Sequence, residues 1–198
     1  MKVRLLDGPL TLAQRLIIGA WSAALLGVVV LWALTASGPL TRDAASAFLS
    51  VGLLIGLLAT FFALTQFLLM GRIAWIEKAF GLDRLASYHR LNGYAAITLI
   101  LAHAPLITAS YALRSGTNYF TQYFELLTQY PYVSLAGIAV VLFVNFVGSS
   151  IYISRKHLKF ETWYSVHLAV SAAIFLASLH QFAICSSFFV NRMAFGLW

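Results

Sequence analysis

Five long apolar runs divide the chain. They cover residues 16–36, 47–70, 88–113, 132–153 and 163–185, and charged side chains gather in the segments between them. A helix needs roughly 20 apolar residues to cross the hydrocarbon core of a bilayer. Backbone groups find no water there, so each run must satisfy its own hydrogen bonds as a helix. The pattern therefore predicts five complete transmembrane helices. A further apolar segment begins near Met193, and we interpret the chain as a fragment that stops within it.

Composition agrees with this pattern. Hydrophobic residues make up 61% of the chain and charged residues only 10%, and the mean hydropathy is +0.86. Soluble domains carry about 25% charged residues. Lipid is therefore the expected surrounding of this chain, and a soluble domain is excluded.

Basic residues alternate between the connecting segments. The formal net charge is +7, which in a soluble chain would raise the possibility of nucleic-acid binding. Here the cations lie beside apolar runs, where they set membrane orientation. The N-terminal arm, every second connector and the start of the third run hold ten of the thirteen cations: Lys2, Arg4, Arg15, Arg72, Lys78, Arg84, Arg90, Arg155, Lys156 and Lys159. The other connectors hold one each: Arg42, Arg114 and Arg192. We expect a multi-pass protein of the plasma (cytoplasmic) membrane with a cytoplasmic N-terminus, and no nucleic-acid partner.

Four of the five histidines lie in predicted spans: His89 and His103 in the third, His167 and His180 in the fifth. A rise of 1.5 Å per residue separates the first pair by about 21 Å along the helix axis and the second by about 20 Å. The third and fifth spans run in the same direction. His89 is then level with His167, and His103 with His180. Two imidazoles at each of two depths match bis-histidine ligation of two b-type haems.

Helix rotation fits one pair better than the other. His103 lies about 40° from the face of His89, whereas His180 lies about 140° from that of His167 on an ideal helix. The fifth span must then tilt, overwind or break its regularity between the two histidines. A haem-free transporter that uses these histidines as proton relays is the alternative of another class. His157 lies in a basic connector, where a solvated or partner-facing role is expected.

Other residues near the histidines allow two interpretations each. Gly93 lies one turn from His89 and leaves room either for a haem macrocycle or for close helix packing. Arg90 is placed to pair with a propionate of the inner haem or to set topology. Gly52 and Gly56 form a GxxxG pair typical of helix packing. The in-span polar residues Gln66 and Asn145 are expected to form hydrogen bonds between helices.

The sequence also resembles a known family. The motifs that carry the resemblance are Gly81-Leu82-Asp83-Arg84, His89-Arg90, Gly93, His103, Phe160-Glu161-Thr162-Trp163, His167 and His180. Together they resemble the ferric reductase-like transmembrane domain, the family of NADPH oxidases and ferric-chelate reductases, over about residues 72–198. The resemblance implies an all-α integral membrane fold, a six-helix bundle of which five spans are complete here. Residues 1–198 would then form one domain, truncated in the sixth span.

The resemblance implies an oxidoreductase whose haem ligands are His89, His103, His167 and His180. Electrons would pass from NADPH through FAD to the inner haem, then to the outer haem, and finally to oxygen or ferric iron outside. The chain has no Gly-rich dinucleotide fingerprint. FAD and NADPH are therefore expected on a missing or separate domain, a cytoplasmic flavin module acting in cis or in trans. The alternative within this chemistry is a stand-alone haem b subunit fed by quinol or a separate flavoprotein. It would resemble the membrane partner of periplasmic methionine sulfoxide reductase.

Overall fold

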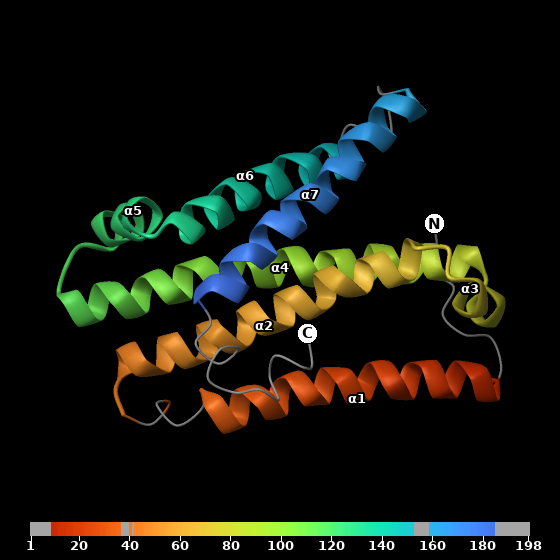
Figure 1. Ribbon diagram of the computed structural model, residues 1–198, viewed down its shortest axis with the longest axis horizontal. Coiled ribbons are helices and arrows are strands. Elements are labelled where there is room, and N and C mark those ends of the chain that lie inside the picture. The colour runs from red at the N-terminus through yellow and green to blue at the C-terminus, as the bar shows by residue number, and fades with distance from the viewer. Residues whose placement is uncertain (1–8, 37–39, 41, 153–158, 185–198) are drawn as a thin grey trace. The chain divides into compact units, whose positions relative to one another are not determined.

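The computed structural model describes residues 9–36, 40, 42–152 and 159–184, and its regular elements there are all α-helices (Figure 1). They are α1 (Leu12–Thr35), α2 (Ala44–Met70), α3 (Ala74–Phe80), α4 (Leu82–Ser115), α5 (Tyr119–Gln129), α6 (Pro131–Tyr152) and α7 (Phe160–Ile184).

The five longest helices coincide with the five predicted apolar runs. Among the described residues, α1, α2 and α4 are each long and apolar enough to cross a membrane. Helix α5 and residues 132–145 of α6, bent by 110° at their junction, make a fourth span if they are counted as one. In α7 the apolar part, His167–Gln181, is shorter. The all-helical membrane class is confirmed and the six-helix count stays a prediction. The apolar segment from Met193 lies outside the described residues.

Two short helices occupy connectors for which the sequence analysis predicted no helix. Helix α5 begins after Asn118, whose side-chain oxygen accepts a hydrogen bond from the Phe120 amide at 2.9 Å. Helix α3 ends at Gly81, whose φ of 77° is readily adopted only by glycine. Ile76 and Phe80 on α3 are buried in a cluster with Leu85 of α4. The connector before α4 is therefore anchored to the helices around it.

The chain forms two compact units, residues 1–107 and 108–198, and α4 contributes to both. In the first unit, α1 packs against α2 and α3, and the Gln14 side-chain amide donates to the Ala79 carbonyl at 2.8 Å. In the second unit, α6 packs along α7, and α5 packs against α6.

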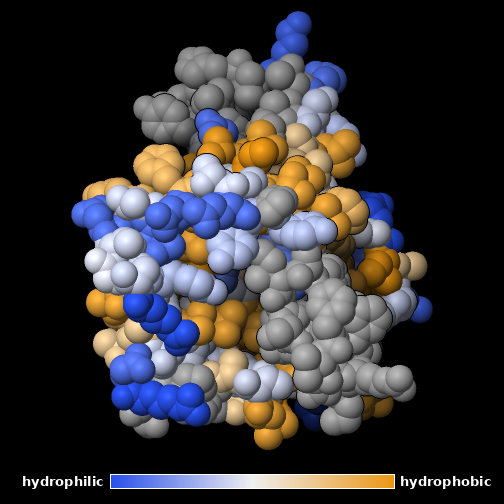
Figure 2. Space-filling view, turned by 60° about the vertical axis from the view of Figure 1, so that its left-hand side comes forward, coloured by the Kyte–Doolittle hydropathy of each residue, from blue (hydrophilic) through white to orange (hydrophobic). Residues whose placement is uncertain are grey.

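Small residues fill the helix contacts, and large apolar residues lie outside. Ala96, Ala139 and Ala173 are each 1% exposed. Small residues let helix backbones approach closely, as is usual for helix contacts in membranes. Figure 2 shows one face on which hydrophobic side chains lie at the surface among hydrophilic ones. The exposed apolar residues include Leu12, Leu16, Leu34, Leu91, Phe120, Phe124, Val141 and Leu168. An apolar exterior of this kind is suited to lipid.

Candidate functional site

His103 lies on α4 where that helix meets α2. Its Nδ1 atom is 2.8 Å from the carbonyl oxygen of Gly52. A Cβ atom placed on Gly56, one turn further along α2, would lie 2.7 Å from both Nδ1 and Cε1 of the ring. The imidazole therefore packs directly on the backbone of α2, in space that only glycine leaves open.

This hydrogen bond identifies which nitrogen of His103 carries the proton. A carbonyl oxygen can only accept, so Nδ1 must be the donor. In the neutral imidazole the second nitrogen, Nε2, then has the lone pair. Histidines that bind metals are commonly held in this way, with the other ring nitrogen donating to a backbone carbonyl or carboxylate.

His180 has the same proton arrangement by a different route. Its Nδ1 atom is 2.7 Å from the carbonyl oxygen of Ala177, three residues earlier on α7 itself. Nδ1 is again the donor and Nε2 again has the lone pair. Both histidines of the predicted outer level thus have the tautomer that suits ligation through Nε2.

The predicted inner level is defined by its packing. The Nδ1 atom of His89 on α4 is buried, and Arg90 beside it is half-buried. A Cβ atom on Gly93 would lie 2.8 Å from Nε2 of Gln66 on α2. The close approach of Gln66 favours the packing role of Gly93, whereas a role beside a macrocycle stays a prediction. His167 on α7 is half-buried.

Helix α7 is unbroken from Phe160 to Ile184 and so runs continuously through His167 and His180. A break in its regularity is therefore excluded as the means of bringing the two onto one face. Tilting or overwinding of the helix stays a prediction.

The four histidines fall into both units. His89 and His103 belong to the first, and His167 and His180 to the second. The structure describes each unit by itself, so the pairing across units stays a prediction. Across the described residues, no three His, Cys, Asp or Glu side chains gather as a metal cluster. An iron held by two imidazoles does not require such a cluster. His157 lies outside the described residues.

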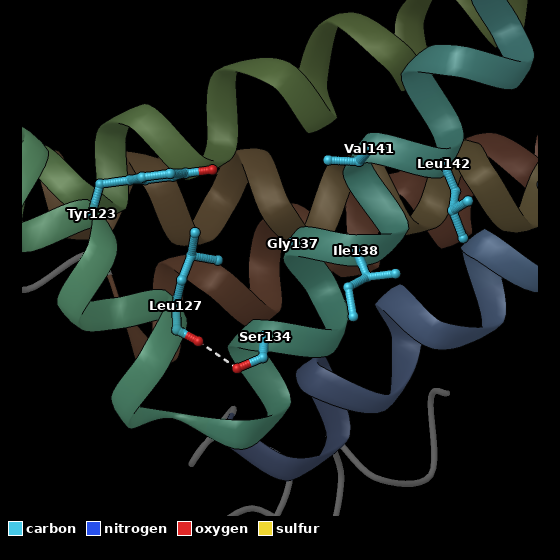
Figure 3. A pocket seen from close by; sticks show the side chains of 7 residues that line it. All are labelled: Tyr123, Leu127, Ser134, Gly137, Ile138, Val141 and Leu142. Carbon is cyan, nitrogen blue, oxygen red and sulfur yellow. Dashed lines mark hydrogen bonds between the residues drawn. The ribbon is translucent and has the colours of Figure 1, made fainter.

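A groove of about 380 Å³ lies between α5 and α6 (Figure 3). Its lining is Tyr123, Leu127, Ser134, Gly137, Ile138, Val141 and Leu142. The Ser134 hydroxyl donates to the Leu127 carbonyl. The groove contains no histidine, and its lining is mostly apolar.

The sequence analysis did not predict the hydrogen bond that Asn92 of α4 makes to α2. The Asn92 side-chain amide donates to the Phe62 carbonyl at 2.7 Å. Asn145, by contrast, donates to Val141 on its own helix at 2.7 Å, so the prediction that it links helices is wrong. His89 and Asn92 are three residues apart and are therefore neighbours on the helix surface. This spacing of two polar residues could have predicted a polar side of α4.

The chain matches the family model described as ferric reductase like transmembrane component over residues 55–178. That range contains His89, His103 and His167 and ends two residues before His180. Neither the curated proteins nor the solved structures give a match to the chain. The match covers more than half of the chain, and the helices are those of an integral membrane protein. The chain is therefore the membrane component of an oxidoreductase, with transmembrane electron transfer as its general function. It belongs to the ferric reductase like transmembrane component family.

Proposed function

We propose that this chain transfers electrons across the membrane through two b-type haems. His89 and His167 hold the inner haem, and His103 and His180 hold the outer one. The donor is a cytoplasmic flavin module that uses NADPH, and the acceptor outside is oxygen or ferric iron. Membership of the ferric reductase like transmembrane component family, whose general function is transmembrane electron transfer, supports this proposal.

The observation that carries the proposal is the shared tautomer of His103 and His180. Each donates Nδ1–H to a backbone carbonyl, at 2.8 Å and 2.7 Å. Iron binds the unprotonated nitrogen of a neutral imidazole. A donor set with Nε2 lone pairs on both α4 and α7 is the one that an axially ligated haem requires. A proton relay would instead favour a histidine that faces other titratable groups, and the acceptors here are peptide carbonyls.

The residues of the chain hold and orient this cofactor. A bound haem supplies an iron that gains or loses one electron, and its potential depends on its axial ligands and surroundings. Two imidazoles would hold each iron, which would then transfer electrons without binding a small molecule. The buried Nδ1 atom of His89 supports a ligand held inside the helix packing, and Arg90 would balance a propionate charge.

The proposed orientation in the membrane rests on the charge pattern. Ten cations mark the N-terminal arm and alternate connectors as cytoplasmic. Their positive charges would attract an electronegative partner, such as the docking face of a flavin module. The FAD and NADPH sites belong to that module, which is part of a longer chain or a separate protein.

The absorption spectrum of the purified protein tests the proposal. We expect an intense Soret band, a sharp α band after reduction, and two haems per chain by pyridine haemochrome analysis. One haem in fully loaded protein would overturn the two-site arrangement. Well-folded protein without haem, purified from cells that are supplied with a haem precursor, would favour the proton-relay function.

A further inference from the structure

We propose that Gly52 and Gly56 of α2 position the outer haem ligand His103, Gly52 through its carbonyl and Gly56 through the absence of a side chain. This rests on the proposed function, in which His103 is a haem ligand. It assigns a role in cofactor binding to a helix that carries no histidine.

The first step is the availability of the Gly52 carbonyl. Inside an α-helix that carbonyl accepts from the amide four residues later, which is that of Gly56. Its second lone pair can accept another hydrogen bond. A neighbouring helix reaches this lone pair only where side chains do not shield the backbone. The pair Gly52 and Gly56, one turn apart on one face, leaves such an opening, and Nδ1 of His103 lies 2.8 Å from the oxygen.

The second step is the space that each glycine leaves. A Cβ atom on Gly56 would lie 2.7 Å from two atoms of the His103 ring. Real Cβ contacts are essentially never this short, so the ring or the helix would have to move. A Cβ atom on Gly52 would instead meet Cδ1 of Ile107 at 2.8 Å and Cβ of Leu106 at 3.3 Å. Gly56 therefore accommodates the imidazole, and Gly52 lets α4 approach closely enough for the hydrogen bond to form.

The third step is selectivity. The Nδ1 proton of His180 is held by Ala177 on the same helix. At the inner level, α2 presents Gln66 to Gly93 and not a glycine to a histidine ring. A change at Gly56 should therefore act on the outer haem through His103 and leave the inner haem unchanged.

The experiment compares Gly56→Ala with Gly19→Ala and Gly27→Ala in the full protein. The two control glycines are on α1, and a Cβ atom on either has no neighbour within 4 Å. All three variants change helix propensity in the same way, so only the contact with His103 differs. Three quantities are measured: haem retention against an apomyoglobin scavenger, the two haem midpoint potentials, and the low-spin ferric electron paramagnetic resonance signals.

We expect the outer haem of Gly56→Ala to be bound about 10–100-fold more weakly, the usual effect of losing a second-shell partner. One midpoint potential and one low-spin signal should shift, because both depend on how the imidazole is held. The other haem and both control variants should match the unchanged protein.

A second variant covers the case in which Gly56→Ala does not insert or fold. Gly52→Ala presses on the flexible end of Ile107, which can turn aside, so a smaller shift confined to the outer haem is expected. Two bound haems with unchanged potentials in both glycine variants would overturn the positioning role and leave the proposed function intact. Equal shifts of both haems would also overturn it, since they would indicate general packing. Absence of haem from the well-folded protein without substitutions would overturn the proposed function itself.

Discussion

His103 and His180 reach the same proton arrangement by opposite routes. The acceptor for His180 is three residues away on its own helix, whereas the acceptor for His103 is 51 residues away on another helix. The first hydrogen bond forms as soon as α7 forms. The second exists only when α2 and α4 are correctly packed. Two ligands proposed for one haem thus differ in what guarantees their orientation.

This difference matters for assembly in a membrane, where helices insert first and associate afterwards. His180 is oriented from the first stage. His103 is oriented only in the second, after the GxxxG pair of α2 has met α4. The site on the α4 side is therefore sensitive to tertiary packing, and the site on the α7 side is sensitive to local helix geometry.

The largest expected effect is the loss of a whole haem. His103→Ala and His180→Ala should each retain one haem per chain instead of two, because alanine offers no ligand to iron. Pyridine haemochrome analysis and a redox titration would both show a single remaining centre, the same one in the two variants. His157→Ala should keep both haems, since the sequence places that residue in a basic connector. Different remaining haems in His103→Ala and His180→Ala would break the comparison, because the two would not then share a site.

How far the sequence predicted this arrangement depends on the range of each contact. The long apolar runs predicted α1, α2, α4, α6 and α7, because hydrophobicity in lipid requires a helix. Helix α5 has only eleven residues and was missed. Its signal was present, since Tyr119, Phe120, Tyr123 and Phe124 follow helical spacing and Asn118 is a favourable cap.

Contacts between helices could not be predicted in the same way. The sequence predicted Gly52 and Gly56 as a packing pair and His103 as a haem ligand, but it did not connect them. Which faces meet depends on the rotation and depth of both helices, which no local pattern specifies. The same reason explains why Asn145 was assigned to the wrong kind of contact. An asparagine in a span must satisfy its amide, and the Val141 carbonyl on its own helix serves as well as one on a neighbour.

A moderate effect is expected from Asn92→Ala, which removes the hydrogen bond to the Phe62 carbonyl. Polar contacts between membrane helices contribute about 0.6 kcal/mol on average and at most about 1.7 kcal/mol. Because Asn92 is only 9% exposed, we expect the upper part of this range. Thermal unfolding should start at a lower temperature, and the inner haem should be lost before the outer one, because Asn92 lies three residues from His89 and eleven from His103.

Asn145→Ala is the matched control for Asn92→Ala. It removes the same chemical group, but its bond lies within α6 and its side chain is exposed. We expect a change within about 0.5 kcal/mol, as for most exposed positions. Equal destabilisation by the two variants would mean that contacts between helices and within one helix contribute alike, contrary to the comparison drawn from His103 and His180.

A small effect is also expected from Glu77→Gln, which removes a contact that is both local and exposed. Nε of Arg72 lies 3.3 Å from Oε2 of Glu77, and the two side chains are 66% and 31% exposed. Ion pairs of this kind contribute between 0 and about 1 kcal/mol and are weakened by salt. Glu77 also lies in the first turn of α3. A negative charge there stabilises the helix through its dipole by about a few tenths of a kcal/mol. The packing of α3 rests on Ile76 and Phe80, which the substitution leaves in place.

The free energy of unfolding of Glu77→Gln should therefore fall by less than about 1 kcal/mol at low ionic strength, and the decrease should be smaller still at high ionic strength. Haem content and both midpoint potentials should stay the same. A larger loss of unfolding free energy that disappears at high salt would mean that local charges hold α3 in place. Exposed local contacts would then stabilise the fold as much as the buried contact between α2 and α4 does.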